Sequence, residues 1–222
     1  MKYLWLYIVG VVVGFVVTYI FYAYTNSSEP RSPAIKQPPA REEISTYSIA
    51  EPPAKSLKGE IASKSGSLLF ESRLATIAGE LKDTNIIQQG ERLMTETGGN
   101  ATLKFDKVGS LELSEETEVS FIQTLPTNFV VEQKRGVVKY TVEGTIPISI
   151  RIRSAVITKS DGGLLQIEMT DGDPIILIST ISGQAKIGFN DLDYVSQVFT
   201  LRSGEIYEYN SDERTAINQS NL

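Results

Sequence analysis

Apolar and polar residues alternate along much of the chain after residue 58. In the segment 101–105 apolar residues alternate with Thr102 and Lys104, and in 146–152 isoleucine occupies every second position. A period of two places successive side chains on opposite faces, which is typical of a half-buried strand. Turn-forming stretches such as Gly98-Gly99-Asn100 separate these segments at intervals of about ten residues. The pattern therefore predicts an all-β domain over residues 59–210.

A different pattern fills residues 3–24, which are apolar and carry no charge. As a helix this segment would be about 33 Å long, enough to cross a hydrocarbon core of roughly 30 Å. A cleaved signal peptide with a site at Ala23-Tyr24-Thr25 is the alternative, but the apolar run is longer than a signal core. We expect a transmembrane helix over 3–24. Lys2 on the short side favours a cytoplasmic stub of residues 1–2 and an extracytoplasmic body in a single-pass protein of the cell membrane.

Gly10 and Gly14 form a G-x-x-x-G motif inside the predicted membrane helix. Small residues at this spacing let two helix backbones approach closely, so the motif predicts a homodimer through the helix. Glycine is also common in membrane helices without any such role. Dimerisation is therefore one of two interpretations of this pair.

Residues 25–58 contain most of the nine prolines of the chain, together with many Ser, Glu and Lys residues. Such a segment buries too little apolar surface to offset its ordering entropy, which predicts a disordered linker. Residues 211–222 are polar and predict a disordered tail.

The chain has no cysteine and no histidine, and its net charge is −6. Disulfides, thiolate metal sites and imidazole-based catalysis are thereby excluded, and we expect no cofactor, no metal and no enzymatic activity. The negative charge disfavours nucleic acid as a partner.

Carboxylates offer the remaining route to chemistry. Glu115, Glu116 and Glu118 lie close together and would be the candidates for a carboxylate-dependent cell-wall glycan hydrolase. The acidic turns 171–173 and 190–193 could offer oxygen ligands to Ca²⁺, but neither matches a complete calcium loop. We interpret the glutamate run as a solvated turn and expect no bound ion at either acidic turn.

Tyr194, Phe199, Tyr207 and Tyr209 lie close together near the C-terminus. They fit two interpretations, a cap on the last strands or an exposed interface rich in tyrosine. We expect capping and keep the four residues as interface candidates.

The order of several motifs resembles a FecR-type domain. The stretches that carry the resemblance are 87–105, 109–121, 136–142, 183–187 and 201–205. The family implies a β-solenoid or roll, with a β-sandwich as the alternative fold. Its Thr positions, here Thr95 and Thr117, also have a plain structural interpretation, in which each hydroxyl satisfies a turn backbone group. Regulators of this family carry an anti-sigma domain before the membrane helix, whereas only Met1 and Lys2 precede it here, so we do not expect sigma-factor control.

These observations favour a membrane-anchored protein that presents a non-catalytic β domain as an interaction module for an envelope protein or glycan. An accessory subunit of a transmembrane signalling complex is the second hypothesis, and the glycan hydrolase is the third.

Overall fold

The computed structural model describes residues 18, 19, 22, 51–81 and 86–221. The chain divides into two units, Met1–Thr46 and Tyr47–Leu222. Of the predicted membrane segment 3–24, only Thr18, Tyr19 and Tyr22 are described, so Gly10 and Gly14 lie outside the described residues. In the described part of the chain, no helix combines the length and the apolar character that a membrane crossing requires. The predicted fold class, a transmembrane helix with an all-β domain, is corrected to all-β for residues 51–81 and 86–221.

The second unit consists of seventeen strands and one short 3-10 helix among the described residues. In chain order they are β1 Gly59–Ser65, β2 Leu68–Glu71, β3 Gly79–Glu80, β4 Ile86–Ile87, β5 Arg92–Thr95, β6 Asn100–Phe105, β7 Gly109–Leu113, β8 Glu118–Leu125, β9 Asn128–Val142, β10 Ile148–Ile152, β11 Ala155–Lys159, β12 Gly163–Met169, β13 Ile175–Thr180, β14 Ala185–Asn190, β15 Ser196–Leu201, β16 Ile206–Asn210, β17 Thr215–Asn218 and η1 Gln219–Asn221. The region expected to be a disordered tail therefore contains β17 and η1.

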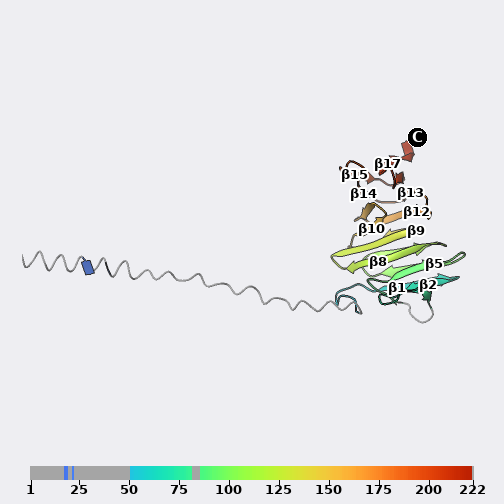
Figure 1. Ribbon diagram of the computed structural model, residues 1–222, viewed down its shortest axis with the longest axis horizontal. Coiled ribbons are helices and arrows are strands. Elements are labelled where there is room, and N and C mark those ends of the chain that lie inside the picture. The colour runs from blue at the N-terminus through green and yellow to red at the C-terminus, as the bar shows by residue number, and fades with distance from the viewer. Residues whose placement is uncertain (1–17, 20–21, 23–50, 82–85, 222) are drawn as a thin grey trace, which may run out of the picture. The chain divides into compact units, whose positions relative to one another are not determined.

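The strands form two wings that share β9. Figure 1 shows β9 in the middle of the domain, with β5 and β8 on one side of it and β12 and β13 on the other. Wing A runs β4-β1-β6-β7, then the second half of β9, then β12-β13-β16-β17. Wing B runs β3-β2-β5-β8, then the first half of β9, then β10-β11-β14-β15. All of these pairs are antiparallel except β9 with β10.

Because β9 belongs to both wings, the strands form one continuous open sheet. The predicted solenoid-like roll is therefore wrong. Alternation along the sequence identifies strands, but it does not reveal that one fifteen-residue strand serves both halves of a sheet. The change of wing occurs at Gly136, whose φ of 86° is open to glycine and unfavourable for other residues.

The apolar faces of the two wings pack on each other to form one core. Phe105 of wing A lies 4.8 Å from Phe129 of wing B between ring centroids, and Phe189 of wing B lies 5.0 Å from Tyr209 of wing A. Every isoleucine of the stripe 146–152 is buried, as the alternation predicts.

Several polar side chains inside the sheet have hydrogen-bond partners within it. The Thr95 hydroxyl donates to Ser114 O and accepts from Thr117 N at 2.9 Å, and the Thr117 hydroxyl donates to Val137 O at 3.2 Å. Both threonines thus satisfy backbone groups at turns, which confirms their structural interpretation. The buried Tyr140 hydroxyl donates to Gln133 Oε1 at 3.0 Å, and burial raises the pKa of this phenol.

Candidate functional site

The edges of the sheet differ in length at its two ends. In the described part of the chain, β3 and β4 end the two wings on one side with two residues each. On the other side, β17 ends wing A with four residues and β15 ends wing B with six. An edge strand leaves a row of backbone donors and acceptors without strand partners, and natural sheets usually blunt such edges. The β15 edge is the longest of these four, and it therefore offers the longest row of backbone groups to a partner.

Strand β15 carries none of the usual features that protect an edge. Its sequence SQVFTL has no charge and no proline, and its register with β14 is regular over the whole strand. Gln197, Phe199 and Leu201 face the core side, whereas Ser196, Val198 and Thr200 face solvent. Val198 is 67% exposed. An uncharged, unbroken edge of this kind can accept another strand.

The hairpin between β14 and β15 is closed by backbone hydrogen bonds. Asp191 N donates to Val195 O at 3.0 Å, and Tyr194 N donates to Asp191 O at 3.1 Å. Tyr194 has a φ of 61°, which is the left-handed conformation of the last residue of a three-residue hairpin loop. Glycine is the favoured residue at such a position, because a Cβ atom is disfavoured there.

The Asp191 carboxylate holds this loop in shape. Its Oδ1 accepts from Val195 N at 2.8 Å and from Asp193 N at 3.1 Å, and its Oδ2 accepts from Gln197 Nε2 at 2.8 Å. The Gln197 amide, followed by the Val195 N–H, lowers the pKa of Asp191 below its usual range. The loop is therefore fixed by its own side chain at neutral pH.

Wing A braces the same loop through Arg214, which lies in the turn between β16 and β17. Its Nη1 donates to Asp191 O at 3.4 Å, and its guanidinium carbon lies 6.0 Å from the centroid of the Tyr194 ring. Such a cation–π contact orients the aromatic ring.

The loop presents three apolar side chains to solvent. Leu192, Tyr194 and Val195 are 61%, 80% and 55% exposed, and we call this group the apolar tip. The tip and the β15 edge adjoin each other in one hairpin. An ordered loop that exposes apolar side chains is a feature of binding surfaces, because its conformation is fixed before a partner arrives.

The other aromatic candidates face the core. Tyr207 and Tyr209 are buried, and the Tyr209 hydroxyl lies 2.7 Å from Ser154 Oγ. Phe199 is partly buried and stacks on Phe189 with 5.9 Å between centroids. Tyr194 is thus the member of the predicted cluster that lies on the surface.

The glutamates proposed for glycan hydrolysis have structural partners. Glu118 forms ion pairs with Arg92 at 3.4 Å and with Lys134 at 3.5 Å. Glu115 accepts from Gly98 N at 2.7 Å, and Glu116 accepts from the Thr97 hydroxyl at 3.0 Å. Within residues 51–81 and 86–221, no group of three or more acidic side chains is arranged to hold a metal ion.

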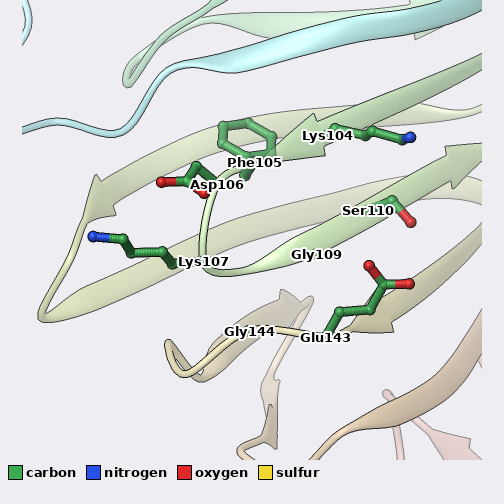
Figure 2. Close-up of a pocket in the computed structure, with 8 residues that line it drawn as sticks. All are labelled: Lys104, Phe105, Asp106, Lys107, Gly109, Ser110, Glu143 and Gly144. Atoms are coloured by element: carbon green, nitrogen blue, oxygen red, sulfur yellow. The ribbon is translucent and has the colours of Figure 1, made fainter.

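Figure 2 shows a cavity of about 400 Å³ beside the β6–β7 hairpin. Two lysines and two carboxylates are among the residues that line it. The Lys104 and Lys107 side chains extend in opposite directions, so their charges do not converge on one ligand position (Figure 2). The cavity lacks the convergent polar groups of a small-molecule site.

Sequence reasoning included Tyr194 but missed Leu192, Val195 and Val198. It considered 190–193 as an acidic turn that could offer oxygen ligands to Ca²⁺, whereas Asp191 uses its carboxylate to bind backbone N–H groups of the hairpin. The available signal was the run Leu-Asp-Tyr-Val directly after an Asn-Asp turn start, because apolar residues in a turn are unusual.

No protein-family model matches this chain, and no curated protein sequence does. Among solved structures, two crystal structures of a candidate anti-sigma factor from Parabacteroides distasonis ATCC 8503 are similar. Both have a TM-score of 0.49, at 16% and 14% sequence identity, and the alignment covers 58% of this chain and 58% of each neighbour. This chain thus matches somewhat more than half the length of those proteins. Membership of the FecR-type family stays a prediction from the sequence motifs.

Proposed function

We propose that the β domain is a non-catalytic protein-binding module whose contact surface is the apolar tip together with the β15 edge. The observation that carries the proposal is Tyr194, a large aromatic residue that is 80% exposed in a backbone conformation suited to glycine. A non-glycine residue in this conformation costs about 1–2 kcal/mol. Unfavourable backbone conformations of this kind concentrate at functional sites. A protein partner fits better than a glycan, because the site offers unpaired strand groups and apolar side chains.

The place of the domain in the cell is a separate part of the proposal. Residues 3–24 attach the chain to the cell membrane, and the body lies on the extracytoplasmic side. The support is the uncharged apolar run and the position of Lys2. The FecR-type resemblance of the sequence favours a role in a signalling complex, and an accessory subunit is the form of that role that fits a chain without catalytic groups.

The binding proposal is tested by photo-crosslinking in cells that make the full chain. Tyr194 is replaced by the photoreactive residue benzoylphenylalanine, and the matched control places the same residue at Ile77, which is 81% exposed and lies in the loop between β2 and β3. We expect a defined covalent protein adduct from position 194 that is absent from position 77. The same adduct pattern from both positions, or no adduct at 194, overturns the proposal.

The membrane proposal is tested by fractionation and protease treatment. We expect the full chain to stay with membranes after alkaline carbonate extraction, and the β domain to be digested when only the extracytoplasmic side is open to protease. Release into the carbonate supernatant contradicts the attachment. Digestion only after the cytoplasmic side is opened contradicts the orientation.

A further inference from the structure

We propose that β15 pairs antiparallel with β15 of a second copy of this chain, across a two-fold axis at Val198. The inference rests on the proposed function, because it names the partner of that same surface. It joins wing B of one copy to wing B of the other in a continuous sheet.

The backbone of β15 has hydrogen-bonding groups that can form such a pair. Asp191 N donates to Val195 O, and the register between β14 and β15 is regular from there to Leu201. Hydrogen-bonded and non-hydrogen-bonded pairs alternate along an antiparallel ladder. The N–H and C=O groups of Ser196, Val198 and Thr200 therefore point away from β14, toward the open edge. Among the described strands, β15 pairs with β14 and with no other.

The side chains of β15 are complementary to themselves. In the proposed register Val198 faces Val198 of the second copy, and Ser196 faces Thr200. An apolar pair then lies at the centre, with a hydroxyl pair on each side, and both kinds of pair stabilise neighbouring strands. Like charges placed directly opposite each other would destabilise a pair of strands. The chain has a net charge of −6, but β15 itself carries no charge, so pairing of two β15 strands brings no like charges together.

Charge complementarity appears at the two ends of the contact. The same register brings the tip of one hairpin toward Arg202 of the second copy, with Tyr194 opposite Arg202 and Asp193 next to it. Arg202 is exposed, and no ion pair of its guanidinium forms among the described residues. A guanidinium between an aromatic ring and a carboxylate gains both cation–π and ion-pair contacts. Both ends of the two-fold contact would gain these contacts.

The size of the contact predicts a reversible dimer. One added strand pair and two apolar tips bury less than a standard interface of about 1,600 Å². Chains held in one membrane, as proposed above, would pair more readily because their effective concentration is raised.

The chain has no cysteine, so any disulfide must form through a cysteine that is introduced for the test. Facing residues of a hydrogen-bonded antiparallel pair have Cα atoms about 5.5 Å apart, within the range that a disulfide spans. The full chain carrying Val198→Cys is oxidised in detergent, and Ile217→Cys on edge strand β17, 52% exposed, is the control. Both variants also carry Gly10→Leu and Gly14→Leu to remove the predicted helix contact. We expect Val198→Cys to form covalent dimers about tenfold faster than the control.

A register test follows with mixed chains. Ser196→Cys and Thr200→Cys should each crosslink poorly alone and efficiently when mixed, and adding Val198→Lys to both chains should abolish that crosslink. Val198 is exposed, so the lysine leaves the fold intact. Equal rates for Val198→Cys and Ile217→Cys, or efficient crosslinking of either single variant, overturn the second copy as partner.

The photo-crosslink at position 194 separates the two proposals. An adduct with the mass of two chains supports both of them. An adduct with a different protein, together with a slow Val198→Cys disulfide, keeps the binding function and rejects the second copy. Failure of both experiments rejects both proposals.

Discussion

The ammonium group of Lys159 donates a hydrogen bond of 3.1 Å to Asp161 Oδ1, although the lysine side chain is fully buried. Its other donors go to Ser182 O at 3.0 Å and Gln184 O at 3.2 Å. Desolvation would raise the pKa of Asp161, but the hydrogen bonds from Lys159 and from Gln184 N outweigh it and lower that pKa. One buried cation thus joins the turn after β11 to the turn after β13.

Replacing Lys159 by methionine should lower the free energy of unfolding by about 3 kcal/mol. The apolar stem would still pack, but two carbonyl oxygens and one carboxylate would lose the donor that the buried ammonium group supplies. The measurement is urea denaturation, monitored by far-UV circular dichroism. Lys186→Met, at an exposed position on β14, is the matched control and should change stability by less than about 0.5 kcal/mol. Equal effects of the two substitutions would mean that the Lys159 contacts add nothing.

Gly136→Ala tests the passage of β9 from one wing to the other. A Cβ atom at Gly136 would clash with Thr117 Cα and Oγ1, and φ is 86°. Backbone strain and overpacking together should cost about 3 kcal/mol or more. Gly172 has a φ of 76° with no atom near its Cβ position, so Gly172→Ala isolates the backbone cost and should lose about 1 kcal/mol. Denaturation midpoints that coincide for the two variants would remove the close approach to Thr117 from the explanation.

Low pH should loosen the hairpin tip before the rest of the sheet. The pKa of Asp191 is lowered in the folded chain, so its contribution to stability is present above the ordinary value of 3.8 and is lost as the pH falls through the folded value. Protonation removes the negative charge that strengthens the hydrogen bonds from Val195 N–H and from the Gln197 amide. The amide resonance of Val195 in an NMR titration should therefore shift below about pH 4. Asp191→Asn should abolish that transition, and its persistence in this variant would assign it to another group.

Strand alternation revealed most of the β domain, and the limits of that prediction have physical causes. In the segments 101–105 and 146–152, the alternation of apolar and polar residues identifies which side chains face the core, because successive side chains of a strand point to opposite faces of the sheet. The double membership of β9 escaped prediction, because it depends on Gly136 meeting Thr117, a contact between residues far apart in sequence. Burial of Tyr209 agrees with the expected capping, but its contact with Phe189 of the other wing could not be predicted, because the two residues belong to strands that are not paired. On the apolar tip, the sequence predicted only Tyr194. Which strand lies at an edge depends on the pairing of strands across the whole sheet, and the local pattern of residues does not contain that information.

Tyr194→Gly should separate stability from binding. Glycine removes the strain of a φ of 61°, worth about 1–2 kcal/mol, but it loses the contact with Arg214 and adds freedom to the unfolded chain. These terms nearly cancel, so the free energy of unfolding should change by less than about 1 kcal/mol. The apolar tip, however, loses its largest side chain, and the Val198→Cys disulfide should form several-fold more slowly because the ring no longer meets Arg202 of the second copy. Glu116→Gly, at an exposed turn residue with a φ of 55°, is the matched control and should leave that rate unchanged. A Tyr194→Gly chain that crosslinks at the original rate would show that the aromatic ring is not part of the contact, and the strained conformation at position 194 would then need a purely structural reason.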